Sequence, residues 1–129
     1  MSTDISVSTW QAELAVDCRC TLGEGPQWDA KNQRLYWCDI LGKQLHWLSP
    51  ASGESGHYQL DHRVSLAAPL AEGGLLLVGE DRLSRFDPSS GSIEKWCDFE
   101  ADNPTTRSND ARIDRHGSLW LSSMGKGAE

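Results

Sequence analysis

A turn signature that occurs twice at a fixed offset constrains the fold of this chain more than any other feature. The segments Leu48 to Glu54 (LSPASGE) and Phe86 to Ser92 (FDPSSGS) both place proline before glycine, and Pro50 and Pro88 are 38 residues apart. In such a turn proline presets φ and glycine supplies the positive φ before the next strand. The offset indicates an internal repeat of similar structural units.

Short alternating or apolar runs surround these turns, whereas helical periodicity is nearly absent, which predicts an all-β fold. The runs fall into two sets of four and the beginning of a third: 25–30, 34–40, 44–48 and 57–60; 65–70, 74–79, 82–87 and 93–98; 109–115 and 118–122. A period of about 40 to 45 residues is that of four-stranded propeller blades. A β-sandwich with similar strand spacing is the alternative, but the repeat favours the propeller.

We therefore predict a partial six-bladed β-propeller of about two and a half blades of four-stranded antiparallel sheets. The expected blades span about 22–61 and 64–99, and a third starts at about 107–125. We expect the segment from Gln11 to Cys20 to be a further strand that serves to close the ring. Because the third set stops after two strands, we expect an N-terminal fragment of a longer protein, or self-association through unpaired blade edges.

Composition narrows the class of protein. A net charge of −7 and a pI near 5.0 argue against nucleic-acid binding, which needs clustered Lys and Arg. The N-terminal residues have neither a basic region nor an apolar region of the kind found in signal peptides, and no apolar run is long enough to cross a bilayer. We expect a cytoplasmic protein without membrane contact.

Glu24 is the first candidate site residue, because glycines bracket it at the entry to a strand (LGEGPQW). Such glycines let backbone and ligand approach closely, and a carboxylate at the start of an innermost strand points into the central channel of a propeller. An ordinary solvated turn glutamate is the alternative.

The segment from Thr105 to Asp114 (TTRSNDARID) provides the second candidate. By two-residue spacing, Arg107 and Asn109 share one strand face, and Asp110 and Arg112 share the other. A guanidinium and an amide on one face suit the hydroxyls or carboxylate of a small polar ligand. An Asx-turn with an exposed arginine explains the pattern equally well. The third candidate is residues 122–124 (SSM) at a strand end. For these residues, a packing role is favoured over ligand binding.

The cysteines and histidines predict no metal site. Cys18 and Cys20 are two apart, which favours neither a disulfide nor a CxxC knuckle, so we interpret all four cysteines, Cys38 and Cys97 included, as reduced core residues. His46, His57, His62 and His116 lack ligand spacing.

The segments LGEGPQWD (22–29), RLYWCDILGKQLHWLSPASGE (34–54), EGGLLLVGEDRLSRFDPSSG (72–91) and TRSNDARIDRHGSLWLSSMG (106–125) together resemble the SMP-30/gluconolactonase/regucalcin-like family. The resemblance covers nearly everything after about residue 16. It implies a six-bladed propeller with one divalent cation, Ca²⁺, Zn²⁺, Mg²⁺ or Mn²⁺, at the bottom of the central cavity, where sugar lactones are hydrolysed.

Residue by residue, the resemblance implies that Glu24 is a metal ligand and that Arg107 and Asn109 bind the substrate. Ser108, Ala111 and the SSM at 122–124 depart from the common pattern of the family, which leaves the substrate open. The other two metal ligands of the family, an Asn and an Asp that is also the general base, lie beyond Glu129 by this alignment, so we expect no catalytic residue within the chain.

We therefore expect a part of a divalent-metal-dependent sugar lactonase that is inactive alone. The alternative is a non-enzymatic propeller module of the YWTD or NHL type that binds a protein partner. The strand with Tyr36, Trp37, Cys38 and Asp39 is neutral between the two.

Overall fold

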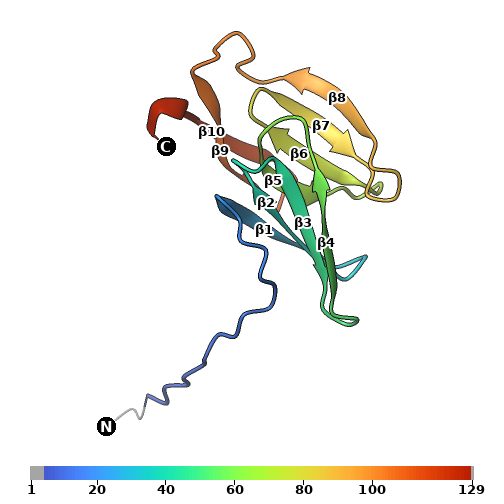
Figure 1. Ribbon diagram of the computed structural model, residues 1–129, viewed down its shortest axis with the longest axis vertical. Coiled ribbons are helices and arrows are strands. Elements are labelled where there is room, and N and C mark those ends of the chain that lie inside the picture. The colour runs from blue at the N-terminus through green and yellow to red at the C-terminus, as the bar shows by residue number, and fades with distance from the viewer. Residues whose placement is uncertain (1–4, 129) are drawn as a thin grey trace.

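Residues 5–128 are described by a computed structural model, and within this range the fold is all-β (Figure 1). The strands are β1 (Gly23–Asp29), β2 (Arg34–Asp39), β3 (Gln44–Ser49), β4 (Glu54–Gln59), β5 (Val64–Pro69), β6 (Leu75–Gly79), β7 (Arg82–Phe86), β8 (Ile93–Asp98), β9 (Thr106–Ile113) and β10 (Leu119–Gly125), followed by the 3₁₀ turn η1 (Lys126–Ala128). Within this range, no helix is long and apolar enough to span a membrane.

The strands form three antiparallel sheets in simple up-and-down order: β1-β2-β3-β4, β5-β6-β7-β8 and the pair β9-β10. Within each sheet, every strand is hydrogen-bonded to the next along the chain, as in propeller blades. The predicted all-β, partial propeller fold is confirmed.

The repeated turn signature has the same geometry in both sheets. Gly53, between β3 and β4, has φ 74°, and Gly91, between β7 and β8, has φ 73°. The Gly53 amide donates to the Ser49 carbonyl at 2.9 Å, and the Gly91 amide donates to the Asp87 carbonyl at 2.8 Å. Both turns therefore need a residue that tolerates positive φ, as the sequence predicted.

The core lies between the sheets, and the middle sheet is buried on both faces. In β6, Leu75 and Leu77 pack against the first sheet, while Leu76 and Val78 pack against β9 and β10 through Ala111. This explains why β6 is apolar along its whole length instead of alternating. The largest core side chain from the first sheet is Tyr36, which is 2% exposed.

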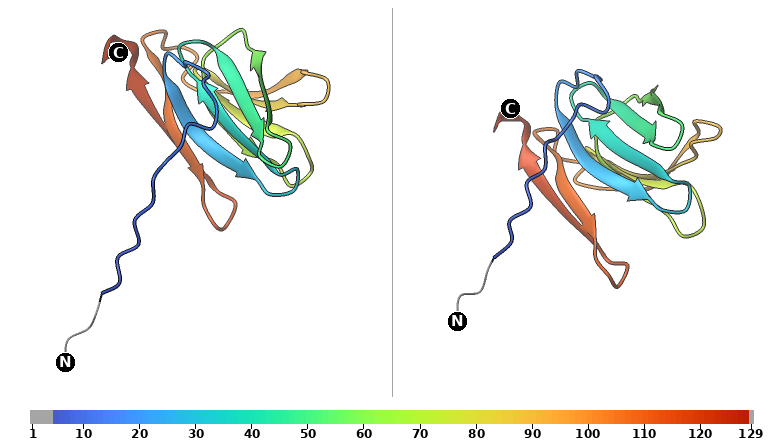
Figure 2. Two further views of the ribbon diagram at one scale, coloured as in Figure 1. Left: turned by 60° about the horizontal axis from the view of Figure 1, so that its bottom comes forward. Right: turned by 90° about the horizontal axis from the view of Figure 1, so that it is seen from below.

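The innermost strands of the three sheets, β1, β5 and β9, meet near the centre of the arrangement (Figure 2). Strand β5 packs against both β1 and β9. The first residues of each sheet are thus brought together, although they are some 40 residues apart in the sequence.

The segment from Gln11 to Cys20 is not a strand, and this prediction was wrong. It runs away from the body of the molecule without pairing to a sheet (Figure 1). A strand is stable only when its backbone groups pair with a neighbour, and this segment pairs with none of the three sheets.

Only one of the four cysteines is a core residue. Cys38 is fully buried, and its burial raises the pKa of the thiol to about 12. Cys97 is exposed on β8, whereas Cys18 and Cys20 are half-buried beside the first sheet. The expectation that all four serve as core residues was wrong for these three.

Candidate active site at the inner strands

Each innermost strand carries one extra residue relative to its partner, so each has a β-bulge. The bulges lie at Gly25–Pro26 in β1, around Ser65 in β5 and at Asn109–Asp110 in β9. A bulge bends its strand and redirects the side chains beside it. Two of the three therefore lie at the residues that the sequence marked as candidates.

Glu24 is exposed and directly precedes the bulge of β1. The next residue, Gly25, has φ 61°, and a Cβ at this position would lie 2.4 Å from the carbonyl oxygen of Ser65 in β5. Gly25 is thus required by the close approach of two blades. The sequence interpretation assigned the glycines to ligand access, but the backbone that approaches Gly25 is that of β5.

The bulges of β5 and β9 are joined by two buried hydroxyl groups. Ser65 Oγ and Ser108 Oγ lie 2.9 Å apart, and Ser65 Oγ also donates to the Val78 carbonyl at 3.4 Å. Both serines are at most 2% exposed. Because buried hydroxyls are stable only when hydrogen-bonded, this pair fixes the position of β9 against β5.

Arg107 and Asn109 lie in different environments on either side of Ser108. Arg107 is 3% exposed and donates from Nη1 to the Ser108 carbonyl at 2.8 Å, whereas Asn109 is exposed. The bulge at Asn109–Asp110 breaks the alternation on which the expected shared face of Arg107 and Asn109 rested. Asp110 and Arg112 are both exposed.

Ser122 closes the bulge of β9 from the neighbouring strand. Its hydroxyl accepts from the Asp110 amide at 3.2 Å and donates to the Asp110 carbonyl at 3.1 Å. The small residue on β10 therefore has the structural role that the sequence favoured for this third candidate.

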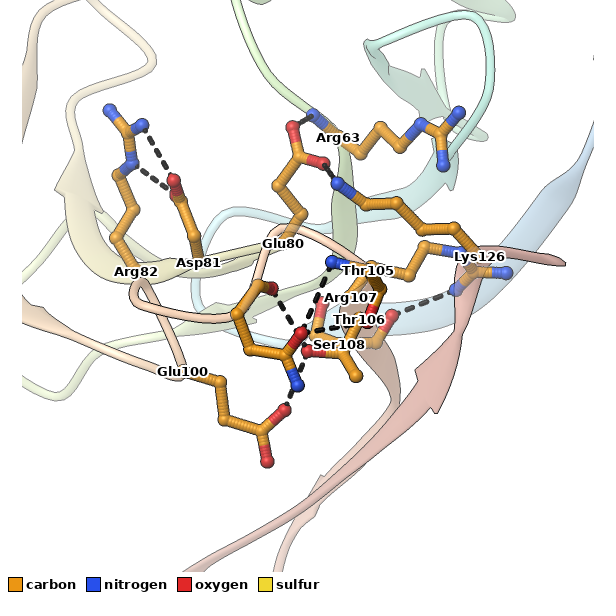
Figure 3. A network of polar contacts seen from close by, with 11 residues as sticks. Arg63, Glu80, Asp81, Arg82, Glu100, Thr105, Thr106, Arg107, Ser108 and Lys126 are labelled. Atoms are coloured by element: carbon orange, nitrogen blue, oxygen red, sulfur yellow. Dashed lines mark hydrogen bonds and ion pairs between the residues drawn. The ribbon is translucent and has the colours of Figure 1, made fainter.

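Glu80 links the middle sheet to β9 and η1, and the sequence gave no indication of this role (Figure 3). Its carboxylate accepts from the Arg63 amide at 3.4 Å and pairs with Lys126 Nζ at 3.1 Å. Its carbonyl accepts the Ser108 amide at 3.3 Å. Glu80 therefore contacts β9 at Ser108 and η1 at Lys126, but its local sequence (GEDR) is that of an ordinary turn.

A hollow of about 460 Å³ lies beside Glu24, between the first sheet and the segment that precedes it. The sheet contributes Pro26 and Trp37, and the segment contributes Leu14, Cys18 and Cys20 among others. Asp39 holds the end of this segment, because its carboxylate accepts the amides of Thr21 and Leu22 at 2.9 and 3.0 Å.

The described residues fit one ligand of a hard divalent cation but not a complete site. Glu24 is an exposed carboxylate, and hard cations take six or more oxygen ligands from carboxylates, carbonyls and water. Asn109 supplies an exposed amide on a second strand that packs against β5. Among the described residues, Glu24 and Asn109 thus offer at most part of the coordination that such a cation needs.

Comparison with known proteins decides the family. The sequence pattern of the SMP-30/gluconolactonase/LRE-like region matches residues 22–129. The chain belongs to this family. It is 37% identical over 121 residues to an L-arabinolactonase of Azospirillum brasilense, and 32% identical over 107 residues to a 6-deoxy-6-sulfogluconolactonase of Pseudomonas putida.

Solved structures of the family superpose on the chain. A calcium-binding regucalcin of Agrobacterium tumefaciens matches with a TM-score of 0.85 and 33% identity over 89% of this chain and 39% of its own. A luciferin-regenerating enzyme matches with a TM-score of 0.79 and 30% identity, over 85% and 38%. The two lactonases are covered over 40% and 35% of their length, from 92% and 80% of this chain. The chain thus spans about two fifths of the relatives that it matches.

Proposed function

We propose that this chain contributes to the hydrolysis of a sugar lactone by a divalent-metal-dependent enzyme. In this proposal Glu24 is one oxygen ligand of the cation, and Arg107 and Asn109 hold the sugar. The observation that carries it is the placement of Glu24 and Asn109, both exposed at bulges of inner strands that pack against β5, in a chain of a family that includes named lactonases.

The chemistry of lactone opening explains why these residue types are needed. A bound divalent cation polarises the ester carbonyl and lowers the pKa of bound water. Glu24 supplies negative charge for the cation. The amide of Asn109 both donates and accepts, which suits ring hydroxyls. Arg107 donates to the Ser108 carbonyl, which holds its guanidinium in one orientation before substrate binds.

The test is a chimaera in which part of this chain replaces the matching part of a relative. Residues 22–125 replace the matching segment of the Azospirillum L-arabinolactonase, and acid release from L-arabinolactone and D-gluconolactone is followed with Ca²⁺, Zn²⁺, Mg²⁺ or Mn²⁺ added. We expect cation-dependent hydrolysis by the chimaera and none above background by residues 1–129 alone, which carry one of the implied oxygen ligands.

Single substitutions in the chimaera separate the proposed roles. Glu24→Gln removes a charged ligand and is expected to abolish cation-dependent turnover, whereas Asn109→Ala and Arg107→Ala are expected mainly to raise KM. Asp110→Asn, an exposed neighbour on the same bulge, is the matched control. An unchanged rate in Glu24→Gln would refute the ligand assignment.

A further inference from the structure

A second cluster of metal-binding side chains lies on the outer face of the first sheet. Cys18 and Cys20, from the segment before β1, meet His46 of β3, and the two sulfur atoms and one ring nitrogen all lie within 4.8 Å of one another. The two Sγ atoms are 3.2 Å apart. His46 is 5% exposed, and both cysteines are half-buried, so the cluster is sheltered without being closed.

Neighbouring side chains orient the imidazole of His46. Gln44 Oε1 lies 3.0 Å from His46 Nε2, and the amide nitrogen of Gln44 is used by Gln59 Oε1 at 3.1 Å. Because Oε1 can only accept, Nε2 carries the proton and Nδ1 keeps its lone pair. The ring also stacks on Trp37, with centroids 5.4 Å apart and planes inclined by 12°. Metal-binding histidines are typically fixed by a hydrogen bond of this kind to the other nitrogen.

We propose that Cys18, Cys20 and His46 bind a thiophilic cation, Zn²⁺, at a site separate from the oxygen site around Glu24. Two sulfurs and an imidazole suit Zn²⁺ and not Ca²⁺ or Mg²⁺. Bond lengths of about 2.3 Å to sulfur and 2.0 to 2.1 Å to nitrogen place tetrahedral ligand atoms roughly 3.5 to 3.8 Å apart. The cluster spans this separation, and both cysteines line the hollow beside the first sheet, through which water can reach them.

Such an ion would tie the segment before β1 to the middle of the first sheet. The described part of this segment makes no strand pairing, and Asp39 holds only its last residues. Binding to the folded state alone stabilises it, so Zn²⁺ raises the unfolding temperature and protects the segment from proteolysis.

The test uses reduced, metal-free protein and Co²⁺ as a spectroscopic probe. We expect a near-ultraviolet thiolate-to-cobalt charge-transfer band that saturates at one equivalent and is removed by Zn²⁺. Cys18→Ser and Cys20→Ser are each expected to weaken the band and to lower Zn²⁺ affinity at least about tenfold, and His46→Gln to lower the affinity similarly. The matched control is Cys97→Ser, because this thiol is exposed on β8.

Two further measurements make the outcomes decisive. Circular dichroism without metal shows whether each variant folds like the parent, and Glu24→Gln is expected to keep the cobalt band, which separates this site from the proposed lactonase site. A cobalt band that survives in the Cys18→Ser/Cys20→Ser double variant overturns the proposal. A reduced parent that binds no cobalt also overturns the proposal. If air then oxidises Cys18 and Cys20 to a disulfide, the pair is a redox couple instead of a metal site.

Discussion

At the scale of single residues, Gly25 determines how closely the first two blades pack. An alanine at this position combines positive φ with a Cβ 2.4 Å from a backbone oxygen that cannot move aside. We expect Gly25→Ala to lower the free energy of unfolding by about 2 to 5 kcal/mol, measured by urea denaturation. Gly53→Ala is the control, because φ is 74° there but nothing lies within 4 Å, so we expect a loss of about 1 to 2 kcal/mol. Equal losses in both variants would contradict the packing role.

Asp39 gives the chain a specific acid sensitivity. Burial raises the pKa of this carboxyl, but the amides of Leu22, Gly42 and Thr21 outweigh it, so the folded-state pKa lies below the usual value. A depressed pKa contributes stability above the unfolded-state pKa of about 3.9, and this is lost as pH falls through the folded-state pKa. We expect Asp39→Asn to lower the unfolding temperature at pH 7. The difference in unfolding temperature between the variant and the parent should become smaller below about pH 4. A difference independent of pH would contradict this linkage.

At the scale of elements, turn chemistry and apolar runs predicted the strands well. The bulges and the fate of the segment 11–20 depend on packing and were not predicted. The paired signature at Gly53 and Gly91 fixed two equivalent turns, because φ there depends on local residues. The three bulges could not be predicted, since an extra residue follows from how β5 meets β1 and β9. The same holds for the segment 11–20, which has the pattern of a strand but no pairing partner.

Glu80 determines how firmly β9 and β10 attach to the middle sheet. Glu80→Gln removes the ion pair with Lys126, whose side chain is 33% exposed, but keeps the bond from the Ser108 amide to the Glu80 carbonyl. We expect a small loss of global stability, about 0.5 to 1 kcal/mol, with faster amide hydrogen exchange in β9 and η1. Asp98→Asn, which breaks the exposed pair with Lys95 on β8, should leave exchange in β9 unchanged. Equal effects of both variants would show that Glu80 has no special role.

At the scale of the whole molecule, the sequence located the candidate site better than it described it. The resemblance marked Glu24, Arg107 and Asn109. In the fold, the two strands that carry them, β1 and β9, both pack against β5. Two-residue spacing could not reveal that Arg107 is buried and Asn109 exposed, because the bulge at Asn109–Asp110 depends on packing across blades. The cluster of Cys18, Cys20 and His46 was also missed, since His46 is distant from the two cysteines in the sequence and meets them only when the first sheet forms.

The exposed apolar side chains of the sheets give the last prediction, which concerns self-association. Trp120 on β10 is 68% exposed, and Trp28 and Trp96 are about half exposed, so these large apolar side chains are available for contact with a second molecule. We expect the sedimentation coefficient of the chain to rise between about 1 and 100 µM, because apolar faces and unpaired edges associate in this range. Trp120→Gln should reduce the rise, whereas Trp10→Gln, in the segment outside the sheets and 93% exposed, should not. A constant coefficient in the parent, or equal effects of the two variants, would exclude the face of β9 and β10 as the contact.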